Sequence, residues 1–282
     1  MVAFSGTDWI KEDNDTIYLS TNSGSSYGSG VSIASTTLSY PSLDTIYGSG
    51  DTIFGGSSSS GLLKSTDNGE TWTRKTASNG LANNFIDTIY ADDQDVYVSH
   101  LFYGISYSSD GGDSFSSFRQ SGGLPDDDTK DVFGIGNSIY VGTAAEGIAI
   151  SNNSGSSWTS VDSSTSGFAT DAVTAVWGVG NSHIFAGTGS GLPISSDGGS
   201  TWSTITTSNG LSGSSNSIID VQAFERYDSS VVVYVLTSSG ISKSTDGGSS
   251  FTLISSEGNG ASSFYIKGKS IVMGANQKTW IL

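Results

Sequence analysis

The sequence predicts an all-β fold, a seven-bladed β-propeller with four-stranded antiparallel blades. One eight-residue phrase with the pattern Ser-x-Asp/Asn-x-Gly-x-Ser/Thr-Trp/Phe occurs five times, at residues 65–72, 108–115, 151–158, 195–202 and 244–251. Its third residue recurs at steps of 43, 43, 44 and 49 residues. Such a period belongs to repeat architectures, and four short strands per repeat make a propeller blade.

The composition supports the same fold class. The chain is 35% hydrophobic and 11% aromatic, with 38 glycines and only 3 prolines. Aromatic and β-branched residues recur in short runs between Gly, Ser, Thr, Asp and Asn, which is typical of turn-rich β structure rather than disorder.

One repeat shows how a blade is built. Residues 131–136 predict a first strand, a tight hairpin turn follows at 136–137, and residues 138–143 predict a second strand. Residues 147–151 predict a third strand, and residues 158–161 a fourth. The repeated phrase therefore forms the turn between the third and fourth strands.

The first strand recurs at a steady spacing and sets the blade boundaries. Similar segments begin at Asp44, Asp87, Ala175, Asp220 and Ser263, and another begins near Val2. We expect one domain over residues 1–282, with blades at 1–43, 44–86, 87–130, 131–174, 175–219, 220–262 and 263–282. The last blade is incomplete, unless the N-terminus supplies its fourth strand or the natural chain continues.

A six-bladed propeller is the alternative. Residues 17–24 resemble residues 233–240, which places them in a second strand and favours seven blades. Residues 20–27, however, also look like a degenerate copy of the repeated phrase. That reading places residues 17–20 in a third strand and makes the first unit partial.

Charge and residue usage exclude several functions. Lys and Arg number 11 against 27 Asp and Glu, a net charge of −16, and no segment gathers basic residues. We therefore expect no nucleic-acid partner, because neutralising phosphates needs clustered Lys and Arg. The absence of cysteine excludes disulfides and thiolate chemistry. No signal peptide or long apolar run occurs, so we expect no membrane insertion.

The repeated phrase itself is interpreted as structural. Its Asp side chain can accept backbone N–H groups of the following turn, and its glycines can take positive φ. Its Trp or Phe lies where the fourth strand begins and can pack on the blade. The residues assigned to this role are Asp67, Asp110, Asn153, Asp197 and Asp246, with Trp72, Phe115, Trp158, Trp202 and Phe251.

These turns resemble the Asp-box of the BNR-repeat propellers, a group that includes sialidases, sortilin-type receptors, xyloglucan-degrading enzymes and photosystem assembly factors. The resemblance covers nearly the whole chain, although Asn153 stands where the box has Asp. It implies that the boxes lie away from the usual active face. A sialidase would need three converging arginines, whereas the chain has three in all, of which Arg74 and Arg119 fall on outer strands. Sialidase activity is therefore not expected.

Acidic residues suggest two candidate cation sites and one enzymatic alternative. Head-of-strand carboxylates could ring one channel mouth and hold calcium, or merely cap their own strands; they are Asp44, Asp87, Asp131 and Asp220. The second candidate calcium site is Asp92, Asp93 and Asp95. A glycoside hydrolase or lyase would use two loop carboxylates, with Asp126–Asp128 and Glu146 as further candidates.

One loop differs from its bland counterparts in the other blades. It reads His100, Leu101, Phe102 and Tyr103, and Phe85 and Tyr40 lie in blade connections on the same side. Exposed aromatic residues stack on sugars or anchor proteins, although a buried Phe is the alternative. We expect a non-enzymatic scaffold that presents loops to a protein or glycan partner in an extracellular, cell-surface or virion setting. A purely structural component of a surface assembly or phage particle is a further alternative.

Overall fold

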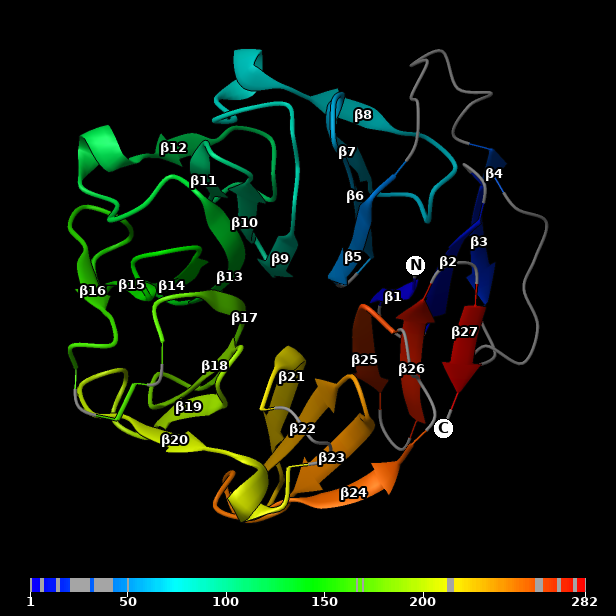
Figure 1. Cartoon of the computed structure of the whole chain (residues 1–282). Helices are drawn as coiled ribbons and strands as arrows, with labels where there is room; N and C mark the ends of the chain where they lie inside the picture. Colours follow the sequence, from blue (N-terminus) through cyan, green and yellow to red (C-terminus); the bar gives the residue numbers. More distant parts are fainter. Residues whose placement is uncertain are drawn as a thin grey trace. The chain divides into compact units, whose positions relative to one another are not determined.

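The computed structural model describes residues 2–5, 8–13, 16–20, 31–32, 43–49, 51–165, 167–168, 170–211, 216–256, 261–267, 270–275 and 278–281. Within these residues the chain forms seven antiparallel sheets, six of four strands and one of three (Figure 1). Two compact units are present, Met1–Gly122 and Gly123–Leu282.

The first unit contains three four-stranded sheets. The first sheet holds β1 (Val2–Ser5), β2 (Asp8–Asp13), β3 (Thr16–Ser20) and β4 (Val31–Ser32). The second holds β5 (Thr45–Ser49), β6 (Thr52–Ser57), β7 (Gly61–Ser65) and β8 (Thr73–Lys75). The third holds β9 (Ile89–Asp92), β10 (Asp95–His100), β11 (Gly104–Ser108) and β12 (Ser116–Phe118). Strand β5 packs beside both β1 and β9.

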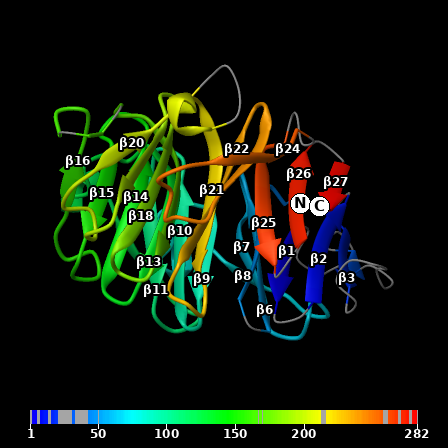
Figure 2. The same ribbon diagram turned by 90° about the horizontal axis from the view of Figure 1, so that it is seen from below.

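The second unit contains the other four sheets. Three have four strands: β13 (Thr129–Ile135), β14 (Ser138–Thr143), β15 (Ile148–Ser151) and β16 (Thr159–Val161); β17 (Val173–Val179), β18 (His183–Thr188), β19 (Leu192–Ser195) and β20 (Ser203–Ile205); and β21 (Ile218–Glu225), β22 (Val231–Thr237), β23 (Gly240–Ser244) and β24 (Thr252–Ser255). The last has β25 (Ser263–Lys267), β26 (Ser270–Ala275) and β27 (Lys278–Ile281). First strands β13, β17, β21 and β25 pack in succession, and Figure 2 shows β21 and β25 from the side.

Burial follows strand position within each sheet. The second strands whose burial the structure describes are buried along almost their whole length, because both faces of each sheet are covered; they are β6, β10, β14, β18 and β22. Fourth strands such as β12 and β16 are three residues long and largely exposed, which suits an edge that must not recruit other chains. The only helices among the described residues are the short 3-10 turns η2 (Ala77–Asn79), η3 (Gln120–Gly122) and η4 (Thr207–Asn209). None of the helices described here has the length and apolar character to cross a membrane.

The structure confirms the four-stranded antiparallel sheets and the place of the repeated phrase between third and fourth strands. In the template repeat the first strand begins at Thr129 instead of Asp131, because a β-bulge separates these two residues. Similar register shifts lie between Val173 and Ala175 and between Ile218 and Asp220. The predicted head of each of these strands therefore follows a bulge inside it.

The first sheet corrects one part of the sequence interpretation. A first strand near Val2 is confirmed, but residues 17–20 belong to the third strand β3 rather than to a second strand. The six-blade reading had placed them there, yet its inference of a partial first unit is wrong, because β1 and β2 both precede β3. Among the described strands, β1 belongs to the sheet β1–β4, and the sheet β25–β27 contains three strands. The number of blades stays a prediction.

Candidate functional site

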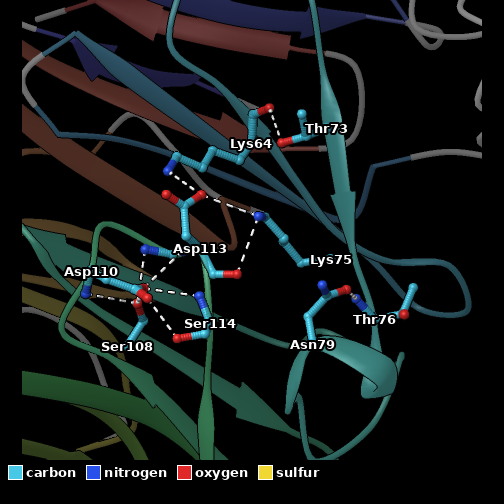
Figure 3. A network of polar contacts seen from close by, with 10 residues as sticks. Lys64, Thr73, Lys75, Thr76, Asn79, Ser108, Asp110, Asp113 and Ser114 are labelled. Atoms are coloured by element: carbon cyan, nitrogen blue, oxygen red, sulfur yellow. Dashed lines mark hydrogen bonds and ion pairs between the residues drawn. The ribbon is translucent and has the colours of Figure 1, made fainter.

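The repeated turns use their polar groups within themselves. In the β11–β12 turn the Ser108 hydroxyl donates to Asp110 Oδ1 at 2.6 Å and accepts the Gly112 N–H at 2.8 Å (Figure 3). The Asp110 carboxylate also accepts the Ser114 N–H at 2.9 Å and the Ser114 hydroxyl at 2.6 Å. The same pattern recurs around Asp67, Asp197 and Asp246, and Asn153 replaces it with an amide that donates to Ser157.

Hydrogen bonds to these carboxylates keep them ionised. Hydroxyl donors lower the pKa of each Asp. The largest cause is the Thr201 hydroxyl for Asp197 and the Ser244 hydroxyl for Asp246, and the pKa of each falls to about 2. The aromatic residues Trp72, Phe115, Trp202 and Phe251 are buried, while Trp158 is half-buried. The hydrogen bonds of these carboxylates are thus made within the turns in which they lie.

The same turns also lock neighbouring sheets together. A Cβ on Gly112 would lie 3.0 Å from the Phe54 ring of the preceding sheet, and one on Gly199 would lie 2.5 Å from Ile150. Beside Gly112, the Asp113 carboxylate receives the ammonium groups of Lys64 at 2.9 Å and Lys75 at 3.1 Å (Figure 3). The repeated turn is therefore a contact between sheets as well as a hairpin turn.

The head-of-strand carboxylates hold backbone groups. Asp131 Oδ2 accepts the Val176 N–H at 2.8 Å, and Asp220 Oδ2 accepts the Phe264 N–H at 2.9 Å, each from the first strand of the next sheet. Asp44 Oδ2 accepts the Ser58 N–H at 2.6 Å in the first unit. Burial, followed by the nearby Asp131 charge, raises the pKa of Asp220 to about 7.

The other candidate cation ligands have local contacts as well. The described residues include no group of three or more His, Cys, Asp or Glu side chains placed to hold a metal ion. Asp87 uses its N–H to donate to Ser99. In the β9–β10 turn, Asp92 lies opposite Asp95, whose Oδ1 accepts the Tyr107 hydroxyl at 2.7 Å, and Asp93 has a positive φ of 52°.

The loop carboxylates considered for catalysis also have local contacts. Asp126 Oδ1 accepts the Asp128 N–H, and Asp128 pairs with the Lys130 ammonium at 2.7 Å. Glu146 is exposed in the β14–β15 loop, where its N–H donates to Thr143 Oγ1. These contacts explain the placement of the loop carboxylates without invoking a substrate.

His100 at the start of the distinctive loop is buried, which corrects the expectation that it contacts a partner. Its Nδ1 lies 2.8 Å from the Phe85 carbonyl oxygen and its Nε2 2.8 Å from Ser106 Oγ. Burial lowers the pKa of His100 to about 4, so the imidazole is neutral. Because the carbonyl can only accept, Nδ1 carries the proton and Nε2 accepts the Ser106 hydroxyl.

Phe102 and Tyr103 follow the buried His100 in the loop and are exposed to solvent. Phe102 is 61% exposed and has a φ of 64°, a left-handed conformation uncommon for a bulky residue. Tyr103 is 39% exposed and donates its N–H to the His100 carbonyl at 3.0 Å. The Arg119 guanidinium carbon lies 5.0 Å from the centroid of the Tyr103 ring, a cation-π distance. We call Phe102, Tyr103 and Arg119 the aromatic corner.

Sequence reasoning missed part of the exposed apolar surface. From the sequence, Arg119 was assessed only as a sialidase arginine. Its position four residues after Phe115, just beyond the fourth strand, was the signal that could have placed it near the outer edge of the sheet. Further exposed apolar residues lie on β21, in the β21–β22 turn and on β24: Phe224, Tyr227, Leu253 and Ile254. Leu101 and Phe85 are half-buried, and Tyr40 falls outside the described residues.

Comparison with solved structures gives the fold. YCF48 from Cyanidioschyzon merolae matches with 14% identity and a TM-score of 0.66, over 99% of this chain and 93% of that one. A structure described as YCF48 bound to D1 peptide matches with 11% identity and a TM-score of 0.68, over 100% and 89%. The GH74 xyloglucanase from Xanthomonas campestris matches with 13% identity and a TM-score of 0.66, over 99% of this chain and 51% of the enzyme. The chain thus spans about half of that enzyme.

At these identities the likeness concerns the fold alone, which is that of a β-propeller. No family model and no curated protein sequence matches the chain.

Proposed function

We propose that this chain is a non-enzymatic Asp-box propeller that acts as a rigid binding scaffold and presents the aromatic corner to a partner protein. The observation that carries the proposal is the exposed Phe102, held at a positive φ directly after the buried His100. The Asp-box assignment rests on the turn chemistry of four Asp residues and one Asn at a common position. The proposed setting is extracellular, on a cell surface or in a virion.

The local energetics support a binding role for the loop. A bulky residue at positive φ costs on the order of 1–3 kcal/mol and persists only where its surroundings impose it. Here two hydrogen bonds fix the His100 ring, and the Tyr103 N–H closes the turn onto the His100 carbonyl. A loop that is already ordered loses little entropy on binding, so its exposed apolar area contributes more fully to affinity.

The chemistry of the aromatic corner supports a peptide partner. Aromatic and arginine side chains are the residue types that most often dominate protein interfaces. A propeller of the same fold is described with a bound peptide, which adds support for this class of ligand. The net charge of −16 favours basic partners over acidic ones. A glycan stacked on Phe102 is the other ligand class.

Two parallel screens test the proposal and separate these classes. Wild-type protein and the variants Phe102→Ala and Tyr227→Ala are each screened against a displayed peptide library and a glycan array. Tyr227 is the matched control, because it is a fully exposed aromatic residue in another loop, the turn between β21 and β22. We expect selected peptides to bind wild type and Tyr227→Ala equally and Phe102→Ala at least about tenfold more weakly, a loss of about 1.4 kcal/mol.

Thermal melting of the three proteins establishes that each is folded. Ligands that bind Phe102→Ala as well as wild type would refute a binding role for the aromatic corner. Signals confined to the glycan array would retain the corner and replace the partner class. Immunolabelling of intact source cells or particles tests the setting, and a purely intracellular signal would contradict it.

A further inference from the structure

In β6, β14, β18 and β22 the last residue of the strand holds the loop that follows it. The Thr188 hydroxyl, for example, donates to the Gly191 carbonyl at 2.8 Å and accepts the Ser190 N–H at 3.1 Å. A buried hydroxyl at the same position accepts an N–H of its own loop in the other three sheets: Ser57, Thr143 and Thr237. A hydroxyl group is uncharged in both acid and neutral solution, so these loops are held in the same way in both.

Strand β10 carries a histidine at this position. His100 is its last residue and is fully buried, with Nδ1 donating to the Phe85 carbonyl and Nε2 accepting the Ser106 hydroxyl, both at 2.8 Å. Its backbone carbonyl accepts the Tyr103 N–H at 3.0 Å, which closes the loop around Phe102. The loop that exposes aromatic residues is therefore held by a side chain that can take up a proton, unlike the four loops held by Ser or Thr.

Protonation of His100 would disrupt this arrangement. Nε2 would then carry an N–H, so the Ser106 hydroxyl would have to turn its hydrogen away from the ring. The Ser106 oxygen already accepts the Ala82 N–H at 2.9 Å, and Ser106 is itself fully buried. The hydroxyl hydrogen would need a new acceptor in buried surroundings, and a hydrogen bond left unmade there is costly.

The surroundings of the ring also oppose a positive charge. Groups from three segments of the first unit lie near it: the connection between β8 and β9, strand β11 and the residues after β12. The titratable or charged side chains of these segments and of the loop are Asp87, Tyr103, Tyr107 and Arg119. Burial lowers the pKa of His100 to about 4, and the Arg119 charge lowers it as well, although the Phe85 carbonyl acts in the opposite direction.

We propose that His100 is a pH switch for the aromatic corner, which holds the loop closed at neutral pH and releases a bound partner in acid. This inference rests on the proposed binding role of the aromatic corner. When the loop opens, the imidazole meets water and binds a proton near pH 6.5, its ordinary pKa, whereas the closed ring does not. Acid therefore favours the open loop, because the proton binds that form more tightly.

The size of the effect follows from the difference in proton affinity between the two forms. The closed form loses stability as the pH falls from about 6.5 to about 4, the range in which the open form alone binds the proton. One proton lowers the ratio of closed to open loop by at most about tenfold per pH unit and by on the order of 100-fold in all. A partner that needs the ordered Phe102 is bound more weakly in proportion to the closed fraction that is lost.

Hydrogen exchange of the Tyr103 N–H tests the switch, because this amide is protected only while the loop is closed. Wild type and His100→Thr are compared between about pH 7 and pH 4, with the intrinsic exchange rate at each pH divided out. His100→Thr is the matched variant, since Thr ends β14, β18 and β22. We expect protection of Tyr103 to fall by on the order of 100-fold in wild type and to stay within about threefold in His100→Thr. The Glu146 N–H, held by Thr143, is the internal control and should not respond in either protein.

An NMR titration of the imidazole needs wild type alone and does not depend on whether a variant folds. We expect the His100 ring of the intact fold to stay neutral above about pH 5, with its proton on Nδ1. A ring that titrates near pH 6.5 without loss of the fold would overturn the proposal. Protection of Tyr103 that is independent of pH in wild type would overturn it as well.

Binding measurements connect the switch to the partner. A peptide selected for dependence on Phe102, free of Asp, Glu and His and amidated at its C-terminus, is titrated at about pH 7 and about pH 4.5. We expect wild type to bind it about tenfold more weakly at the lower pH, and His100→Thr to bind it equally at both. Equal affinities of wild type at the two pH values would refute control of binding by His100. If no peptide depends on Phe102 at neutral pH, the proposed binding role fails, and the exchange of Tyr103 still decides whether the switch exists.

Discussion

Replacing Ser108 by alanine is predicted to destabilise the first unit by about 2 kcal/mol. The Ser108 hydroxyl is buried, accepts the Gly112 N–H at 2.8 Å and donates to Asp110 Oδ1 at 2.6 Å. Its loss leaves the buried Gly112 N–H without its acceptor, which costs about 1–3 kcal/mol. The exposed Asp110 carboxylate keeps its bonds to Ser114, so the second loss adds only about 0.5 kcal/mol.

Urea denaturation followed by tryptophan fluorescence measures this loss, with Ser116→Ala on the exposed strand β12 as the control. A destabilisation of about 2 kcal/mol corresponds to a fall of roughly 4–8 °C in the melting temperature. Because Ser195 and Ser244 make the same bonds in their own turns, their alanine variants should show similar losses. A change below about 0.5 kcal/mol, the range of ordinary surface substitutions, would refute the structural role of the repeated serine.

Three further predictions concern pH and backbone conformation. The pKa of Asp220 is about 7 in the folded chain, above its value in the unfolded chain, so the free energy of unfolding should fall as the pH rises from about 4 to 7. Asp220→Asn should remove this pH-dependent loss, which is at most about 4 kcal/mol, from denaturation curves measured across that range. The pKa of Asp246 is shifted in the opposite direction, to about 2, so its ionised carboxylate stabilises the fold above pH 4, and this contribution is lost between about pH 4 and 2. The melting temperature of Asp246→Asn should therefore fall less with acid over that range, and acid profiles identical to wild type would contradict a stabilising role for the carboxylate. Gly80→Ala should cost at least about 2 kcal/mol, because φ is 92° and the new Cβ would lie 1.9 Å from the Phe115 carbonyl oxygen; Gly122→Ala, with open space around it, is the control in the same unfolding assay.

Local chemistry made the repeated turn predictable from sequence. The bonds that the repeated Ser and Asp make within the turn join residues no more than four positions apart, such as Ser108 with Gly112 and Asp110 with Ser114. The first sheet was harder to assign, because residues 20–27 look like a degenerate copy of the repeated phrase, while residues 17–24 resemble a second strand. Only the pairing of β2 with both β1 and β3 resolves the two readings.

The candidate site depended on contacts that sequence spacing does not encode. The buried His100 ring is held by a hydrogen bond to the Phe85 carbonyl, which lies fifteen positions earlier in a connection between sheets. Arg119 reaches Tyr103 from beyond the outer strand β12. A loop that contains His, Phe and Tyr could be recognised as unusual, but which side chains face solvent is decided by these neighbours.

Lys64 and Phe102 show how a repeated strand pattern acquires contacts that belong to one sheet. Lys64 lies in a Gly-x-x-Lys-Ser strand and faces Phe54 of the preceding strand. The Asp113 carboxylate, from the turn of the next repeat, pairs with the Lys64 ammonium at 2.9 Å and joins two sheets. Phe102 lies at the equivalent place in its own sheet to residues 58–60 and 144–146, but those loops contain no aromatic residue. The repeat therefore sets the position of each loop, while the residues that differ between repeats decide which loop exposes apolar area.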